Sequence, residues 1–184
     1  MTRPAKHIAI LFLTLFVNHA ICYALEDSTR VRKSILKVVK KIARYKTVDR
    51  GPVGFSAELT KQFERYLYLS THATNKELVI LTNHKNQNVR AYSFEILVGK
   101  DFKDIRQILD KHIGDTTIIK IRSGCINTTE HINFYFLKLL TPKPYDKSSN
   151  IKLTDDEVKE IKVKMAATYF LDGLFQKGQD PRCL

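Results

Sequence analysis

Tryptophan is absent from the chain, and turn-forming residues are few, with 7 glycines and 5 prolines among 184 residues. Hydrophobic residues make up 43% of the sequence, which is more than a disordered tail contains. This composition suits a helical globular protein better than a β-sandwich. We therefore predict an all-α fold with one domain of ordinary size.

Long apolar runs are also missing, except for one near the amino terminus. Residues 8–17 are apolar and follow the charged residues Arg3 and Lys6. The run is too short to cross a bilayer of ~30 Å, and no later stretch is longer. This pattern is typical of a signal peptide rather than of a membrane span.

Small residues at positions 22 and 24 place the expected cleavage after Ala24. We expect a signal peptide over residues 1–24 and a single domain over residues 25–184, exported to the periplasm or secreted. A lipid anchor on Cys22 is the alternative. It is disfavoured because His19, Ala20 and Ile21 do not form the run of small residues that should precede a lipidated cysteine.

Cysteine is scarce, with three residues in the whole chain. Two of them, Cys125 and Cys183, would remain after cleavage. In an oxidising compartment they could form a disulfide between the middle of the domain and its tail. Spacing alone does not decide this, because a disulfide needs Cα atoms about 4.4–6.8 Å apart.

Basic residues outnumber acidic ones. Without Arg3 and Lys6 the chain keeps 29 Lys and Arg against 19 Asp and Glu, a net charge of +10. Such a field favours anionic partners, either a protein or an anionic envelope component, with a membrane surface as an alternative. Because the chain is expected to be exported, we expect no nucleic acid partner.

The charge is concentrated on a predicted amphipathic helix over residues 28–46, whose apolar residues recur at helical spacing. Its other face is basic: Arg32, Lys33, Lys37, Lys40, Lys41 and Arg44. We interpret these six residues as a surface for an anionic partner. The helix could instead lie on an anionic membrane, or its lysines could simply be solvated.

Further helices are predicted over residues 57–69, 88–98, 102–112 and 131–140. Capping boxes predict two more, one starting at Thr74 with Glu77 and one starting at Thr154 with Glu157 and ending near residue 175. Two glycines and a proline make residues 47–56 a loop. The β-branched run 116–121 has strand propensity but no evident partner, so we interpret it as irregular or as a helix start.

Residues 77–97 resemble a HEAT repeat, in which Val-Arg opens the second helix and a small residue follows four positions after the valine. Val89, Arg90 and Ser93 match this pattern. The resemblance implies that Val89 and Leu97 fill the layer between the two helices, and that Arg90 faces the turns. The usual acidic turn residue is absent, since the turn here is amide-rich.

The longer run from Asn88 to Cys125 is similar to a group of exported bacterial HEAT-like proteins. That resemblance implies a short stack of helical hairpins with atypical capping helices, and it implies export. It carries no established activity. Residues 102–121 look like a second, degenerate unit with Asp115 at its turn.

Catalytic candidates are few. A thiol near an imidazole can form a nucleophilic dyad, so Cys125 with His131 and the adjacent Glu130 could serve a hydrolase or transferase. The chain has no phosphate-binding glycine loop, no His-Glu-x-x-His and no Gly-x-Ser-x-Gly sequence. We therefore expect no cofactor or metal, and no activity follows from a motif.

The sequence favours a non-enzymatic interaction or scaffold module with a basic surface. A hydrolase or transferase using Cys125 and His131 is the first alternative. A peripheral membrane-surface protein is the second. The sequence leaves the oligomeric state open.

Overall fold

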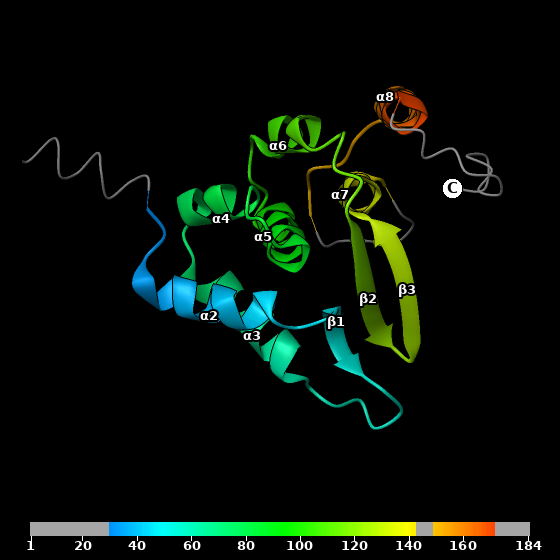
Figure 1. Ribbon diagram of the computed structural model, residues 1–184. Coiled ribbons are helices and arrows are strands. Elements are labelled where there is room, and N and C mark those ends of the chain that lie inside the picture. The colour runs from blue at the N-terminus through cyan, green and yellow to red at the C-terminus, as the bar shows by residue number, and fades with distance from the viewer. Residues whose placement is uncertain (1–29, 143–148, 172–184) are drawn as a thin grey trace, which may run out of the picture.

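The computed structural model describes residues 30–142 and 149–171, which contain seven helices and three strands (Figure 1). In chain order these elements are α2 (Lys33–Ala43), β1 (Val48–Val53), α3 (Lys61–His72), α4 (Asn75–Leu81), α5 (Gln87–Gly99), α6 (Ile105–Lys111), β2 (Ile118–Gly124), β3 (Ile126–His131), α7 (Ile132–Leu140) and α8 (Asp155–Leu171). The expected signal peptide at residues 1–24 lies outside the described residues.

β2 is the central strand of a small sheet in which β1 runs parallel to it and β3 antiparallel. Asp49 of β1 lies opposite Arg122 of β2. The pairing is irregular between Asp49 and Val53, where Gly51 has a φ of 90° and Pro52 follows it. A proline is tolerated there because β1 is an edge strand, in which not every N–H has to bond a neighbour.

The sheet shows that the predicted all-α, HEAT-like helical stack is wrong. Residues 118–121 of the β-branched run begin β2, and the segment 47–56 that was expected to be a loop contains β1. The paired residues Asp49 and Arg122 are 73 positions apart in the sequence. Local periodicity cannot reveal a strand whose partner is that distant.

The helix predictions fare better, with each expected helix found at slightly shifted bounds. Both capping boxes are confirmed. The Glu77 N–H donates to Thr74 Oγ1 at 3.2 Å and the Thr74 N–H donates to Glu77 Oε2 at 2.9 Å. The corresponding distances between Thr154 and Glu157 are 3.3 and 2.7 Å. The expected end of the last helix near residue 175 lies outside the described residues.

α5 is the central helix, with ten of its thirteen residues buried and α2, α3, α4 and α7 packed around it. Val89, Ser93 and Leu97 are all fully buried, as expected for the helix pair α4–α5. Arg90 faces the turn, where it donates to the His84 carbonyl at 2.8 Å. Its Nε lies 2.9 Å from Oδ2 of Asp115. Asp115 therefore pairs with Arg90, although the turn between α4 and α5 has no acidic residue of its own.

Candidate anion-binding groove

A groove of about 520 Å³ runs between α2 and α3, which pack side by side (Figure 1). Four residues of each helix line it: Ser34, Lys37, Val38 and Lys41 from α2, and Lys61, Glu64, Arg65 and Tyr68 from α3. Each helix therefore contributes two basic residues, and Glu64 is the one acidic side chain that the described part of the chain places in the lining.

The α2 wall follows from the amphipathic pattern of that helix. Ile35, Val39 and Ile42 are buried against the core. Lys37 and Lys41 are four residues apart, so they lie on the same face one turn from each other. Both are exposed, and neither has a hydrogen-bond or ion-pair partner within residues 30–142 and 149–171. Their charges are available to a ligand.

The α3 wall repeats this spacing with Lys61 and Arg65. Lys61 lies 3.6 Å from Glu64, and the two side chains are 79% and 51% exposed, so the pair is weak. Arg65 is held more firmly, since it donates to Gln62 Oε1 at 3.2 Å and lies 5.6 Å from the centre of the Tyr45 ring. One side of the groove is thus oriented in advance by its neighbours.

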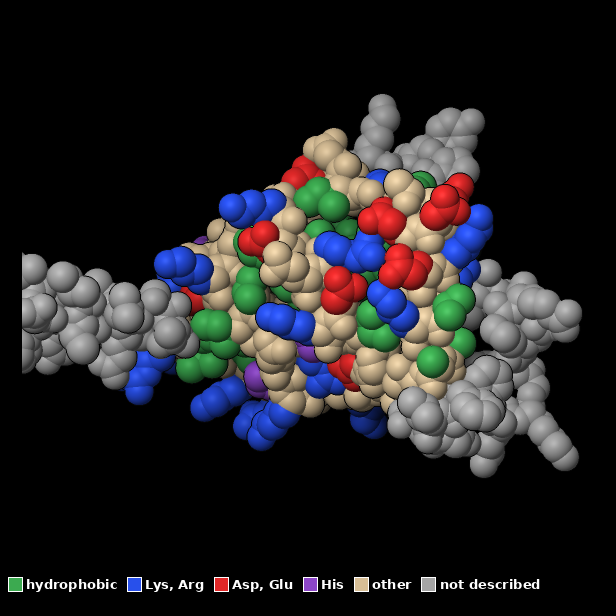
Figure 2. Space-filling model, turned by 90° about the horizontal axis from the view of Figure 1, so that it is seen from above, with side chains coloured by type: hydrophobic (Ala, Val, Ile, Leu, Met, Phe, Trp, Pro, Cys, Tyr) green, Lys and Arg blue, Asp and Glu red, His purple; other side chains and the backbone are tan. Residues whose placement is uncertain are grey.

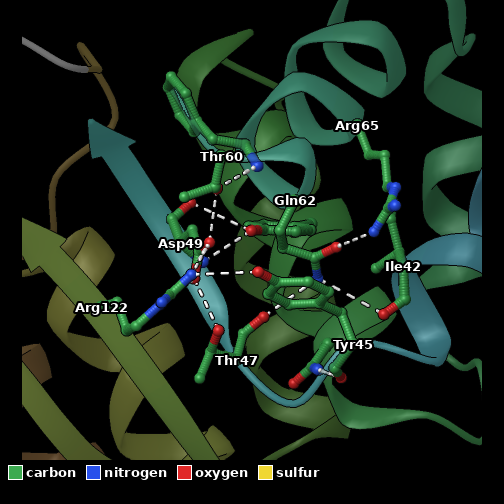
Figure 3. A network of polar contacts seen from close by, with 11 residues as sticks. Ile42, Tyr45, Thr47, Asp49, Thr60, Gln62, Arg65 and Arg122 are labelled. Carbon is green, nitrogen blue, oxygen red and sulfur yellow. Dashed lines mark hydrogen bonds and ion pairs between the residues drawn. The ribbon is translucent and has the colours of Figure 1, made fainter. Parts of the chain in front are cut away.

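A buried amide fixes the two helices relative to each other. Gln62 of α3 has no exposed surface, and its Nε2 donates to the carbonyls of Thr47 and Ile42 at 3.0 and 3.4 Å (Figure 3). Ile42 is in the last turn of α2, and its carbonyl also accepts from the Tyr45 N–H at 3.1 Å. Gln62 therefore ties the start of α3 to the end of α2.

Asp49 extends this network to the sheet (Figure 3). Arg122 donates to its two carboxylate oxygens at 2.9 and 2.6 Å, Thr60 Oγ1 donates at 2.6 Å and Thr47 Oγ1 at 2.7 Å. Thr60 is also the N-cap of α3, accepting from the Phe63 N–H. The position of α3 is thereby set by a strand as well as by α2.

The Asp49 carboxylate is charged despite having no exposed surface. Burial raises its pKa, but the hydrogen bonds from Arg122, Thr60 and Thr47 outweigh burial and hold the pKa below its ordinary value of 3.8. A charged, fully bonded carboxylate requires all of its donors to stay in place. The network therefore joins the start of α3 to the sheet and stabilises the position of that groove wall.

The six basic residues predicted as a surface divide into three groups. Arg32 is engaged elsewhere, with its Nη2 2.7 Å from Glu77 Oε2 and 2.6 Å from the His72 carbonyl. Lys37 and Lys41 line the groove. The remaining three residues are exposed outside the groove lining: Lys33 and Lys40 on α2, and Arg44 at its C-cap.

The opposite side of the molecule has a different charge pattern. Figure 2 shows the surface from above, the side of α6 and α8, and acidic side chains there are interspersed among Lys and Arg. Arg106 and Glu157, for example, approach to 2.8 Å. Lys and Arg side chains gather without acidic neighbours along the lower left edge of that view (Figure 2). On this face the charges are therefore mixed, except along that edge.

The structure does not bring the predicted catalytic residues together. Cys125 is exposed in the turn between β2 and β3, whereas His131 is the last residue of β3. Strands rise about 3.3 Å per residue, which separates the two by roughly 20 Å. His131 Nδ1 instead contacts the Thr116 carbonyl at 2.6 Å, and Glu130 pairs with Lys138 at 3.1 Å.

The predicted disulfide falls partly outside the described residues, because Cys183 is not among them. Within the described part, no group of three His, Cys, Asp or Glu side chains is placed to hold a metal ion. None of the helices described is long and apolar enough to cross a membrane.

Compared with known proteins, the chain matches no protein-family model and no curated sequence. The HEAT-repeat resemblance of residues 77–97 and the expected export therefore stay predictions.

Proposed function

We propose that this chain is an exported, non-enzymatic interaction module that binds an anionic partner in the groove between α2 and α3. The observation that carries the proposal is the pair Lys37 and Lys41, which face the same groove as Lys61 and Arg65 without a partner of their own among the described residues. Like charges held close together repel, and a bound anion removes that repulsion. The favoured ligand is therefore a chain or surface carrying several negative charges.

The residues of the groove support binding rather than catalysis. Among the described residues its lining includes no cysteine or histidine, and its hydroxyl groups belong to Ser34 and Tyr68. The hydrolase alternative depended on Cys125 and His131, which lie at opposite ends of β3. No other observation favours that alternative.

Charge reversal at the α2 wall tests the proposal. Fluorescence anisotropy with labelled poly-L-glutamate measures affinity for the wild-type chain and for a Lys37→Glu, Lys41→Glu double variant. We expect the double variant to bind at least about tenfold more weakly, because two attractions become repulsions. Wild-type affinity should also fall as salt is raised, because salt screens exposed charges.

A matched control is the double variant Lys103→Glu, Lys120→Glu, which makes the same change in net charge at two exposed lysines outside the groove lining. We expect this control to retain nearly wild-type affinity. Equal weakening by the control and by the Lys37→Glu, Lys41→Glu variant would show that net charge, not the groove, determines binding. An affinity unchanged by salt would contradict the electrostatic basis of the proposal.

A further inference from the structure

Next to the groove, two loops present three exposed apolar side chains, which we call the apolar tip: Phe55, Leu59 and Ile126. Phe55 is 102% exposed in the loop after β1, Ile126 is 66% exposed in the β2–β3 hairpin, and Leu59 is 58% exposed just before α3. The Gly54 N–H donates to the Gly124 carbonyl at 3.0 Å, which holds the two loops together. Figure 1 shows both loops at the same end of the molecule.

The apolar tip is convex. Every residue from 54 to 59 is exposed, so nothing within the described chain covers this loop. Gly54 and Gly124 have φ angles of 75° and 56°, in the left-handed region that permits tight turns. A protein partner would need a preformed pocket for such a projection, whereas lipid can deform around it. A lipid surface is therefore the better match in shape.

Positive charge adjoins the apolar tip. Lys61 follows Leu59 by two residues and shares the groove with Lys37, Lys41 and Arg65. The acids here are Glu64, which pairs with Lys61, and Glu58, which accepts from Ser56 Oγ at 3.2 Å. Cations outnumber acids in this region. Apolar side chains beside a cluster of cations are the combination that binds anionic membrane surfaces.

We infer that the apolar tip inserts into the interface of an anionic lipid membrane while the groove beside it binds lipid headgroups. This inference rests on the proposed anion-binding function and names its partner as a lipid surface. The apolar stripe of α2 is unavailable for this purpose, because Ile35, Val39 and Ile42 are buried in the core. The tip therefore supplies the apolar contact with the membrane.

The absence of tryptophan provides a site-specific test. Phe55→Trp introduces a single tryptophan at the tip, and Val163→Trp introduces one at a 70% exposed position of α8 as the matched control. With vesicles of phosphatidylglycerol and phosphatidylcholine, the emission of Phe55→Trp should shift to the blue and be quenched by brominated lipid. Val163→Trp should show neither effect. Absence of the shift in Phe55→Trp, or an equal shift in Val163→Trp, would overturn the inference.

A second measurement separates the inference from the proposed function. Both side chains changed in a Phe55→Ser, Ile126→Ser variant are exposed, so we expect it to fold normally. Its affinity for the anionic vesicles should fall at least about tenfold, because burial of apolar surface is lost. Its affinity for poly-L-glutamate should not change.

The outcomes are distinguishable. If vesicle binding requires Lys37 and Lys41 but not Phe55 and Ile126, the inserted tip is disproved and the anion-binding groove stands. If the wild-type chain binds poly-L-glutamate but not anionic vesicles, the lipid partner is disproved alone. If the wild-type chain binds neither probe, the proposed function fails together with the inference.

Discussion

Asp49 is the residue on which the support of the groove depends. It joins Arg122 of β2 to Thr60, the N-cap of α3, through a carboxylate without solvent exposure. Nothing in the sequence distinguishes Asp49 from the other polar residues of a Gly-Pro segment. Its role follows from the pairing of β1 with β2, which places Arg122 opposite it.

We predict that Asp49→Ala lowers the free energy of unfolding by about 3 kcal/mol, because it leaves a guanidinium and two hydroxyls without their acceptor. Arg122 is 30% exposed, so water compensates part of its loss. Urea unfolding of the variant and wild type measures the difference. Asp156→Ala, at a 94% exposed carboxylate, is the control and should change stability by less than about 0.5 kcal/mol. Equal effects of the two substitutions would contradict the role assigned to Asp49.

At the scale of elements, helices were predictable from sequence and strands were not. The apolar spacing of α2 and the capping boxes at Thr74 and Thr154 are local signals, each contained within a few residues. β1 carries two features that favour a loop, Gly51 and Pro52, and its parallel partner is distant in the chain. β2 had the right propensity, but its antiparallel partner β3, which follows directly after Cys125, is mostly polar and did not look like a strand.

Glu77 connects α2, α3 and α4. It lies beside the start of α2 and the end of α3, whereas Gln62 lies at the opposite end of this helix pair. Its carboxylate accepts from the backbone N–H and the Nε of Arg32, at 3.0 and 2.8 Å, while Arg32 Nη2 also donates to the last residue of α3. The same carboxylate completes the capping box of α4. The side-chain hydrogen bonds from Arg32 lower the pKa of Glu77 from 4.5 to about 2, against the opposing effect of burial.

This shift predicts a specific pH dependence of stability. A carboxyl whose pKa is lower in the folded state stabilises fully above its unfolded pKa of 4.5, and this contribution disappears as pH falls towards 2. Between about pH 5 and pH 2, the free energy of unfolding of the wild type should therefore fall by roughly 2 kcal/mol more than that of Glu77→Gln. This figure is reduced because Arg32 is half-exposed and water screens its charge. Urea unfolding at several pH values across that range measures how the free energy of unfolding of each protein depends on pH.

The control for this comparison is Glu64→Gln, which removes an exposed carboxylate from a weak pair on α3. Its stability should decline with acid as the wild type's does. A Glu77→Gln variant that retained the full wild-type dependence on pH would show that Glu77 is not the group responsible.

At the scale of the whole molecule, the candidate site was predictable in part. The basic face of α2 was visible in the sequence, and Lys37 and Lys41 were in the expected set. The α3 wall and its supporting amide Gln62 were not, because their contribution depends on the packing of α3 beside α2. Arg32, which the charge pattern grouped with the lysines, instead holds helices together. A linear pattern of charge does not reveal which charges are paired.

Lysine footprinting shows where on the molecule an anionic ligand binds. The chain is acetylated with and without bound poly-L-glutamate, and the modification of each lysine is measured by mass spectrometry. If the ligand binds in the groove, it should protect Lys37, Lys41 and Lys61, which line the groove, and leave Lys120 on β2 as reactive as before. Equal protection of all four lysines, or protection of Lys120 without the groove lysines, would contradict binding in the groove.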